Sequence, residues 1–309
     1  MNLEGSRILV TGGAGFIGSN VANRLAPHAD VIAVDDTSLG TPTNLVDAVT
    51  FVDQDVCTTG IPADVDLVIH LAALSSYSMH ETEPARGVRV NVEGFVNTIE
   101  QAKQSGCTQV VYASTSSVYG SSPEPSSEAD PVQARTGYEA SKLARERYAE
   151  YFHSHYGMHL AGLRFFSVYQ GYGGNESHKG TYANVIAQFA DDIASRNRPV
   201  LYGDGTQTRD FTHVDDVVSA IIAAAREQLH GIYNVGTGKS TSFNEIVTRL
   251  NRLLGRDIKP VYIDSPIPSS VYVEHTCADS SKIQRETDWY PQIELETGLR
   301  QVCSQYLEA

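Results

Sequence analysis

Residues 7–18, RILVTGGAGFIG, decide the fold of this chain. The stretch opens with Arg7–Thr11, an apolar and β-branched run that is typical of a short buried strand. Gly12, Gly15 and Gly18 then follow at a regular spacing. Glycines at such positions allow a tight turn, close approach of a pyrophosphate, and close packing of a helix against the strand. The free N–H groups of that helix would face the phosphates. The stretch therefore predicts a dinucleotide-binding turn in an α/β domain.

Further strand-like runs alternate with helical segments over the first half of the chain. These runs are short and largely apolar, and they lie at 31–35, 65–71, 109–113 and 160–165. Residues 85–104 and 139–156 instead place apolar side chains at helical spacing. Apolar strands separated by helices indicate a parallel sheet that is covered on both faces. We expect a doubly wound parallel sheet over 1–165, rejoined by 211–235, and a smaller C-terminal domain over 166–309.

The composition argues against several classes of protein. The 309 residues include 37 acidic and 23 basic side chains, and the resulting net charge of −14 argues against nucleic-acid binding. The four cysteines are widely spaced, which argues against a zinc site or a disulfide framework and fits a reducing compartment. No apolar run approaches the roughly 18 residues that span a bilayer, and no leader segment is recognisable. We expect a cytoplasmic protein with no membrane partner.

Two acidic positions indicate which dinucleotide binds. Asp35 ends the second strand-like run, where a carboxylate can accept both hydroxyls of the adenosine ribose. The same charge would repel a 2′-phosphate, so the predicted cofactor is NAD rather than NADP. Asp36 adds to that repulsion, although a turn carboxylate is the better interpretation of Asp36 alone. Asp55 and Val56 close a further short strand and are expected near the adenine.

Tyr138 and Lys142 form a candidate proton-transfer pair. They lie four residues apart in a helical segment and therefore share one face. A cation beside a phenol favours the phenolate, which can take a proton from a hydroxyl. Residues 113–120, ASTSSVYG, end a predicted strand and carry hydroxyls that could bond the same oxygen. Separately, each feature also fits an ordinary helix surface or a strand cap, but their order along the chain favours a catalytic site.

With these motifs in place, the chain resembles the extended short-chain dehydrogenase/reductase family. It is similar in particular to the nucleotide-sugar epimerases and dehydratases of that family, such as the UDP-glucose 4-epimerases. The resemblance covers nearly the whole chain. Beyond the segments above, it includes 70–73 (HLAA), 90–94 (VNVEG), 163–166 (LRFF), 203–211 (GDGTQTRDF) and 234–238 (NVGTG).

The resemblance implies a role for individual residues. Thr115 would be the catalytic hydroxyl, with Ser114 and Ser116 as second choices, Tyr138 would be the base, and Lys142 would hold the nicotinamide ribose. Together with the turn and Asp35, the expected cofactor site comprises Gly12, Gly15, Phe16, Ile17, Gly18, Asp35, Asp55, Val56, Leu71, Ala72, Ala73, Asn91, Ala113, Tyr138 and Lys142. The expected substrate site comprises Ser75, Thr115, Ser116, Tyr138, Ser167, Asn184, Val185, Tyr202, Arg209 and Thr276.

Arg209 and the nearby C-terminal motif bear on the nucleotide. By the resemblance, Arg209 would clamp a nucleotide diphosphate, which suits a guanidinium fork. The alternative is an ion pair with Asp210 or Asp215. Two departures from the family weaken the substrate assignment. Ser167 stands where an asparagine is usual, and Ser269 stands where many members carry a phosphate-binding arginine, a role that Tyr272 or His275 could take over.

The residues after Thr115 separate the possible reactions. Related dehydratases carry Asp-Glu there, whereas this chain has Ser116 and Ser117, which cannot remove protons from carbon at neutral pH. We therefore expect 4-epimerisation of a UDP-sugar through a 4-keto intermediate. The small Thr276 leaves room for N-acetyl sugars beside glucose and galactose. Three alternatives stay open. The chain could epimerise another nucleotide sugar such as UDP-glucuronate, it could be a 4-keto reductase, or it could be a non-catalytic NAD-binding sensor or scaffold.

Two further expectations concern metals and assembly. His153, His155 and His159 lie close together, but their spacing lacks a third-ligand geometry and the reaction needs no metal, so none is expected. In the resembled family, the helices that correspond to 85–104 and 139–156 pair across a two-fold axis. A homodimer is therefore expected.

Overall fold

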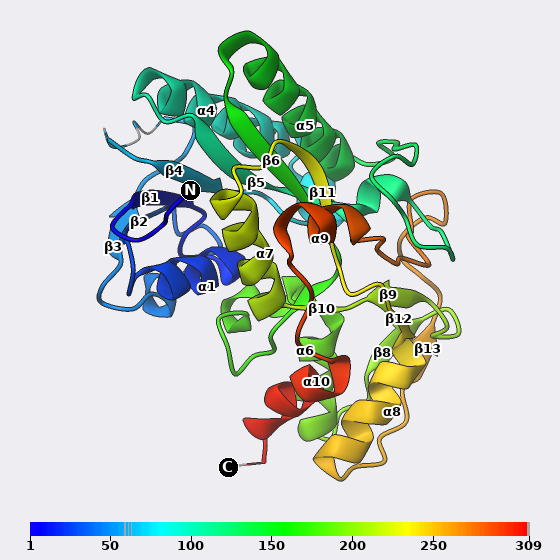
Figure 1. The fold of residues 1–309 in the computed structure, drawn as a ribbon. Helices are drawn as coiled ribbons and strands as arrows, with labels where there is room; N and C mark the ends of the chain where they lie inside the picture. The colour runs from blue at the N-terminus through cyan, green and yellow to red at the C-terminus, as the bar shows by residue number, and fades with distance from the viewer. Residues whose placement is uncertain (59, 61, 63, 308–309) are drawn as a thin grey trace.

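The computed structural model describes residues 1–58, 60, 62 and 64–307 (Figure 1). Its centre is a seven-stranded sheet in which all neighbouring strands pair in parallel. In spatial order the strands are β11 (Gly231–Val235), β6 (His159–Phe165), β5 (Gln109–Thr115), β4 (Leu67–His70), β1 (Arg7–Thr11), β2 (Asp30–Asp35) and β3 (Thr50–Asp53). The order reverses between β1 and β4, which is where a doubly wound sheet opens a crevice at its carboxyl edge. The predicted α/β doubly wound fold is confirmed.

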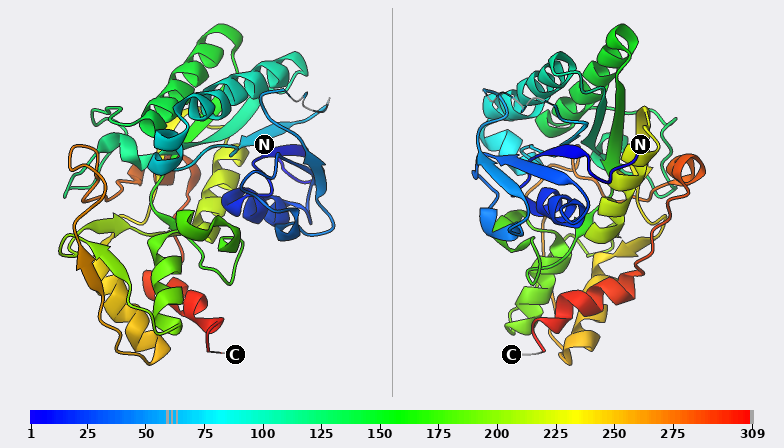
Figure 2. Two further views of the ribbon diagram at one scale, coloured as in Figure 1. Left: turned by 180° about the vertical axis from the view of Figure 1, so that it is seen from behind. Right: turned by 60° about the vertical axis from the view of Figure 1, so that its left-hand side comes forward.

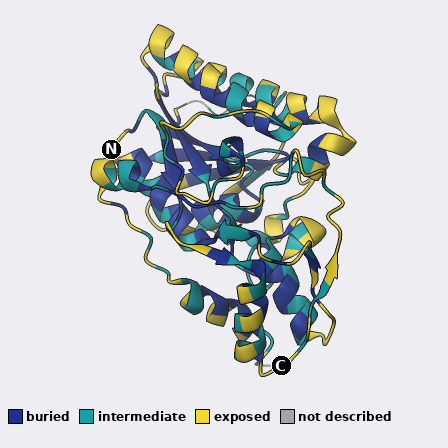
Figure 3. Cartoon of the chain, turned by 90° about the vertical axis from the view of Figure 1, so that its right-hand side faces the viewer, coloured by how far each residue is buried: buried dark blue, intermediate teal, exposed yellow. Residues whose placement is uncertain are grey.

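Helices cover both faces of this sheet (Figures 1 and 2). On one face, α1 (Phe16–Leu25) and α7 (Val214–Arg226) share a buried apolar core with the strands. On the other face lie α4 (Gly94–Gln104) and α5 (Gly137–Tyr156), which enclose a second core. In Figure 3 the strands of the sheet are mostly buried, whereas the helices above them carry exposed residues on their outer side.

The segment 85–104 is not one regular helix. It contains α3 (Pro84–Val88), a π-helical turn at Arg89–Glu93, and then α4, and the short α2 (Tyr77–Thr82) precedes it. Apolar spacing alone predicted a single helix. The wider turn changes which side chains face inward, so that Asn91 is buried whereas Val88 is exposed. π-Helical turns are frequent at functional sites.

The C-terminal part packs small elements around a core of its own. The helices α6 (Val185–Ala194), α8 (Phe243–Leu254) and α10 (Leu295–Ser304) bury their apolar sides against one another, and α9 (Ser281–Thr287) lies near β11. Three two-stranded pairs complete it: β7 (Val168–Tyr169) with β10 (Thr212–His213), β9 (Thr208–Asp210) with β12 (Ser240–Ser242), and β8 (Val200–Tyr202) with β13 (Val261–Ile263). Among the described residues, no helix combines the length and the apolar character that a bilayer span requires.

Candidate functional site

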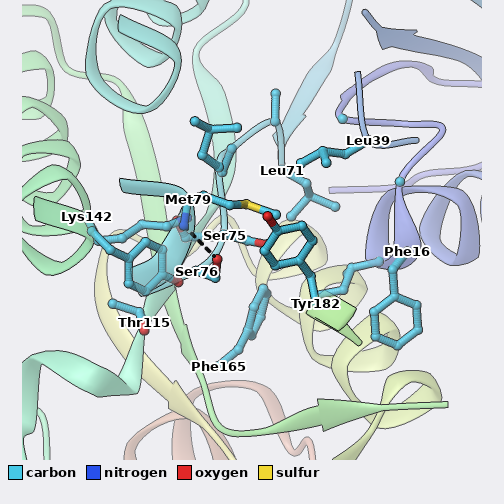
Figure 4. Close-up of a pocket in the computed structure, with 18 of the residues that line it drawn as sticks. Phe16, Leu39, Leu71, Ser75, Ser76, Met79, Thr115, Lys142, Phe165 and Tyr182 are labelled. Atoms are coloured by element: carbon cyan, nitrogen blue, oxygen red, sulfur yellow. Dashed lines mark hydrogen bonds between the residues drawn. The ribbon is translucent and has the colours of Figure 1, made fainter. Parts of the chain in front are cut away.

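A cavity of about 510 Å³ lies at the carboxyl edge of the sheet. Its wall combines the turn after β1, the ends of β2, β4 and β5, the start of α5, and segments of the C-terminal part. Figure 4 shows side chains from these segments converging on the centre of the cavity. The cavity therefore lies at the switch point of the sheet, where ligands of doubly wound folds bind.

The glycine turn forms one end of the cavity. Gly12 has φ +66°, and a Cβ atom on it would lie 2.6 Å from the main-chain nitrogen of Ala72. A Cβ atom on Gly18 would lie 2.0 Å from the carbonyl oxygen of Gly12. Neither position can carry a side chain, because main-chain atoms occupy that space. Helix α1 begins at Phe16 with no acidic residue in its first turn, so its N-terminal dipole is available for a phosphate.

Asp35 presents a partly satisfied carboxylate to the cavity. It is 8% exposed and accepts hydrogen bonds from the main-chain nitrogens of Ala14 (3.1 Å) and Thr37 (2.9 Å). Burial raises its pKa above the ordinary value, although these two hydrogen bonds oppose the rise. The main-chain nitrogen of Gly15 adds a third such contact, and because an ionised carboxylate accepts about four hydrogen bonds, capacity remains for the adenosine ribose. The glycine turn and Asp35 together fit an adenine dinucleotide.

The candidate catalytic side chains come from α5 and β5. Thr136 caps α5 by accepting a hydrogen bond from the Glu139 nitrogen at 3.2 Å, which fixes where the helix begins. The Thr115 side chain lies close enough to Tyr138 to lower its pKa, and Lys142 Nζ donates to the Ala113 carbonyl at 3.0 Å. The three residues that the sequence predicted for catalysis, Thr115, Tyr138 and Lys142, all line the cavity. The predicted constellation is therefore assembled in one place.

The choice among the neighbouring hydroxyls follows from their partners. Ser114 Oγ donates to Glu146 at 2.6 Å, so its proton is already engaged with a buried carboxylate. The Thr115 hydroxyl bonds Ser117 instead, lines the cavity and lowers the pKa of Tyr138. This arrangement favours Thr115 over Ser114 as the hydroxyl that acts with Tyr138.

Burial dominates the ionisation of this centre. It raises the pKa of Tyr138 above its ordinary value, although the Thr115 hydrogen bond and the charge of Arg145 lower it in part. Burial and Arg145 together hold the pKa of Lys142 well below its ordinary value. The expectation that Lys142 favours the phenolate is therefore incomplete, because burial works against both charged forms.

Arg209 forms the opposite end of the cavity. Its guanidinium lies 5.4 Å from the ring centroid of Phe243 and 5.8 Å from that of Tyr272. It donates to the carbonyls of Thr208 at 2.8 Å and Glu274 at 3.0 Å, and also to that of Val273.

The alternative of an ion pair between Arg209 and a nearby aspartate is wrong for the described part of the chain. Asp215 pairs with Arg24 at 3.0 Å. Asp210 accepts hydrogen bonds from Thr237 and from main-chain nitrogens. Arg209 thus presents its charge to the cavity without a carboxylate partner, which suits a diphosphate.

Most of the predicted site residues line this cavity. They are Gly12, Gly15, Phe16, Ile17, Gly18, Asp35, Asp55, Val56, Leu71, Ala72, Ala73, Ser75, Ala113, Thr115, Ser116, Tyr138, Lys142, Ser167, Arg209 and Thr276. Asp55 also pairs with Arg89 at 3.0 Å, so part of its charge is neutralised.

Four predicted residues do not line the cavity. Asn91 is fully buried behind it, where its side chain bonds both main-chain groups of Leu74. Asn184 caps α6 by accepting from the Ile186 nitrogen at 3.0 Å, and Val185 packs against the C-terminal core. Tyr202 lies against Tyr272, with ring centroids 6.4 Å apart. Resemblance placed these residues by sequence, but their side chains have structural partners here.

Other lining residues were not expected from the sequence. Lys179 lines the cavity with its ammonium 5.5 Å from the ring centroid of Phe16, beside the start of α1. Tyr182 projects toward the centre of the cavity, in the same view as Met79 and Ser75 (Figure 4). The only signal was a basic and an aromatic residue in a glycine-rich stretch, which reads equally well as a surface loop.

His153 and His155 lie in the last turn of α5, and His159 begins β6. Among the described residues, no group of three or more potential ligands could hold a metal ion. His153 instead stacks on His230, with ring centroids 3.5 Å apart, and bonds the Met158 carbonyl.

Comparison with known proteins agrees with this geometry. Residues 8–236 match the sequence model of the NAD dependent epimerase/dehydratase family. The chain belongs to that family. Its fold, its class as a nucleotide-sugar epimerase-family enzyme and its use of NAD are thereby confirmed. The individual roles of the site residues stay predictions.

Named relatives are similar over their full length. A putative UDP-glucose 4-epimerase of Methanocaldococcus jannaschii is 33% identical, over 96% of this chain and 97% of its own. A UDP-N-acetylglucosamine 4-epimerase from Methanobrevibacter ruminantium, solved with UDP-N-acetylmuramic acid, has a TM-score of 0.92 at 30% identity and covers 99% of both chains. A Thermotoga maritima UDP-glucose 4-epimerase, solved with UDP-glucose, has a TM-score of 0.87 at 30% identity and covers 98% of both chains.

Proposed function

We propose that this protein catalyses NAD-dependent 4-epimerisation of a UDP-sugar. The observation that carries the proposal is that Thr115, Tyr138 and Lys142 all line one cavity. The two residues that follow Thr115 in the sequence are Ser116 and Ser117, which carry hydroxyls and no carboxylate. Epimerisation needs one base, one hydrogen-bonding hydroxyl and a held cofactor, and this cavity offers residues for each. Dehydration would need a further acid and base at the neighbouring carbon.

The reaction follows from what each side chain can do. Tyr138 takes the proton of the C4 hydroxyl, while Thr115 holds the same oxygen by a hydrogen bond. Bound beside these residues, NAD would supply the hydride acceptor and donor for C4. After the 4-keto sugar has turned, Tyr138 gives the proton back to the oxygen. Lys142, held by the Ala113 carbonyl, lies where it can orient the nicotinamide ribose.

The end of the cavity around Arg209 supports a nucleotide diphosphate. The guanidinium is held in place by main-chain carbonyls and two aromatic rings, so little conformational freedom is lost when it binds phosphate. Tyr272 also lines the cavity and offers a ring and a hydroxyl to the nucleotide. Binding energy at this remote end keeps the sugar in the cavity while it turns.

Thr276 supports a wider choice of sugar. It lines the cavity at 8% exposure, and its hydroxyl accepts a hydrogen bond from the Asp210 nitrogen at 3.4 Å. A threonine leaves more room than a tyrosine beside the C2 substituent of the sugar. We therefore propose that UDP-N-acetylglucosamine is accepted as well as UDP-glucose, in keeping with the two substrates named among the relatives.

We also propose a cytoplasmic homodimer. The outer faces of α3 and α5 expose large apolar side chains: Val88 is 56% exposed, Tyr148 42% and Tyr156 46%. Pairing of these helices with those of a second copy would remove that apolar surface from water. The cysteines are all unpaired, as expected in a reducing compartment.

A panel of UDP-, dTDP- and GDP-sugars tests the reaction and the nucleotide together. The enzyme is incubated with each sugar without added reductant, and the C4 epimers are then separated. We expect interconversion of the UDP-sugars and no net consumption of cofactor, and Tyr138→Phe serves as the inactive control. In a parallel incubation with NADH and a 4-keto nucleotide sugar, stoichiometric consumption of NADH, together with no epimer in the first panel, would identify a reductase. If no sugar reacts, and cells that carry Tyr138→Phe behave like cells that carry the parent protein, the chain is an NAD-binding scaffold.

A further inference from the structure

Arg145 is a buried cation beside the catalytic residues, and no ion pair is found for it among the residues that the structure describes. It follows Tyr138 and Lys142 on α5 at helical spacing, so the three side chains share one face. It is 0% exposed. The neighbouring carboxylate of Glu146 instead pairs with Arg164 at 2.7 Å and accepts a hydrogen bond from Ser114. A charge this deeply buried is normally paired.

Main-chain carbonyls take the place of the missing carboxylate. Arg145 Nε donates to Asn91 O at 2.5 Å, Nη2 donates to Ala72 O at 2.8 Å, and Nη1 lies 3.5 Å from Ala113 O. The guanidinium also lies 5.5 Å from the ring centroid of Phe95. Each nitrogen of the guanidinium thus has a carbonyl partner, but carbonyl dipoles do not cancel the positive charge. The positive charge therefore remains effective in the surrounding low-dielectric interior.

The three carbonyls belong to segments that shape the cofactor end of the cavity. Ala72 follows β4 and packs against the glycine turn, since its nitrogen occupies the space beside Gly12. Ala113 belongs to β5 and also accepts from Lys142. Asn91 lies in the π-helical turn, where Arg145 supplies a donor to its carbonyl. One guanidinium thus joins three separate segments behind the catalytic residues.

We propose that Arg145 is a positioning residue of the catalytic centre: its guanidinium fixes three main-chain carbonyls around the cavity and supplies, at neutral pH, a positive charge that stabilises ionised Tyr138. This inference rests on the proposed role of Tyr138 as the base of the 4-epimerase. Geometry connects the guanidinium to Tyr138: Arg145 and Lys142 share the Ala113 carbonyl, and the Lys142 ammonium lies 5.8 Å from the centroid of the Tyr138 ring. Lys142 loses its proton more readily when buried. A guanidinium holds its charge in such a place, which an ammonium does not.

The ionisable groups around the centre agree with this role. The charge of Arg145 lowers the pKa of Tyr138, and the pKa of Arg145 itself, about 10, stays above neutrality. Burial lowers the pKa of both nearby histidines, His70 and His80, which leaves them uncharged at neutral pH. The other ionisable groups that face this centre are Tyr112 on β5, Glu139 on α5, which pairs with Arg135, and the Glu146–Arg164 pair between α5 and β6.

Two neutral replacements test the charge directly. Arg145→Met keeps an apolar stem in the core, and Arg145→Gln keeps a hydrogen-bond donor. The pH at which Tyr138 ionises is read from ultraviolet difference titration of each protein against the same protein carrying Tyr138→Phe. We expect both variants to raise that pH by about one unit or more, because an opposite charge close to a phenol is lost. The acid limb of the kcat profile should move by the same amount, with little change in KM.

Arg147→Met is the matched control. Arg147 lies two residues along the same helix and is exposed, so its loss removes the same charge outside the centre. Its titration and pH profile should stay those of the parent protein. If the neutral Arg145 variants fold and bind NAD but leave the ionisation of Tyr138 unchanged, the proposal is overturned, and Arg145 has a packing role only.

Folding failure and failure of the proposed function can both be recognised. If neither neutral variant melts cooperatively, Arg145→Lys carries the test. A single ammonium cannot bond three separated carbonyls, so a smaller rise is expected, and an unchanged ionisation pH again overturns the proposal. The titration needs no sugar. An absence of epimerase activity in the parent protein would therefore refute the proposed function, while the effect of Arg145 on Tyr138 would still be measured.

Discussion

Replacing Asp35 by asparagine should weaken NAD binding strongly. It should also reduce the preference of the protein for NAD over NADP. The change keeps the volume of the side chain and removes its charge. In the structure, two of about four acceptor sites of the carboxylate are used by the main-chain nitrogens of Ala14 and Thr37. The main-chain nitrogen of Gly15 also contributes, and the carboxylate lines the cavity, where its remaining capacity would bind the hydroxyls of the adenosine ribose. Asparagine has a single acceptor oxygen, so at least one of these bonds is lost.

The size of the effect follows from the strength of such bonds. A hydrogen bond to a charged group contributes about 1.5–3 kcal/mol. With one bond lost and the other weakened, we expect a loss of about 2–3 kcal/mol, which corresponds to a roughly 30- to 140-fold weaker NAD complex. NADP should lose much less, because the repulsion of its 2′-phosphate by Asp35 is relieved by the same substitution.

Calorimetric titration of both dinucleotides into cofactor-free protein measures this difference. Asp36→Asn is the control: Asp36 is the next residue, and its carboxylate bonds Ser38 at 2.7 Å rather than the main chain of the glycine turn. It removes the same charge and should change NAD affinity only slightly. Equal losses of NAD and NADP affinity in Asp35→Asn, or tighter binding of NADP by the parent protein, would refute the role of Asp35.

The same carboxylate predicts how cofactor binding depends on pH. Burial raises the pKa of Asp35, and the ionised form is the one that accepts ribose hydroxyls. NAD affinity should therefore be constant above that raised pKa and fall as the pH drops through it, beginning at a higher pH than for an ordinary aspartate. In Asp35→Asn this acidic decline should be absent.

Three further substitutions test the catalytic and substrate ends of the cavity. Tyr138→Phe should lower turnover by about 100-fold or more with NAD still bound, and near-normal turnover would assign the proton to another group. Arg209→Ala should raise KM for the UDP-sugar by about 10- to 100-fold through the loss of charge-assisted bonds, and an unchanged KM would place the diphosphate elsewhere. Thr276→Tyr should abolish the use of UDP-N-acetylglucosamine and spare UDP-glucose, since overpacking costs about 1–3 kcal/mol. Parallel loss of both sugars would show that Thr276 does not set the pocket.

The parts of the site that sequence predicted correctly are those fixed by local geometry. Gly12 and Gly18 must lack a side chain because the turn itself fills that space, so their spacing in the sequence already carries the constraint. Tyr138 and Lys142 face the same way because helical spacing dictates it. The strand at Arg7–Thr11 was predicted with its observed bounds because its apolar and β-branched residues are themselves a local pattern.

The parts that sequence did not predict depend on partners far along the chain. Asn184 and Tyr202 were expected in the substrate site, but one caps α6 and the other lies against Tyr272. Arg145 falls in the charged run RER, which by sequence reads as a solvated helix face. Its burial depends on carbonyls from three other segments, and no local pattern reports where those carbonyls lie.

The cavity also depends on how the segment after β7 is held against the cofactor-binding half. Polar side chains make this connection: Asn20 bonds Gln170 at 3.1 Å, Asn175 bonds Ser19 at 2.9 Å, and Asn44 bonds His178 at 3.1 Å. Single hydrogen bonds of this kind contribute only about 0.5–1.5 kcal/mol each, far less than a buried apolar interface. The Lys179 and Tyr182 side chains, which follow directly, line the cavity beside Phe16 and the start of α1. A dinucleotide bound on the α1 turn would add a charged contact to this weak polar connection. We therefore expect that bound NAD orders this segment, so that the cavity is fully assembled only when the cofactor is in place.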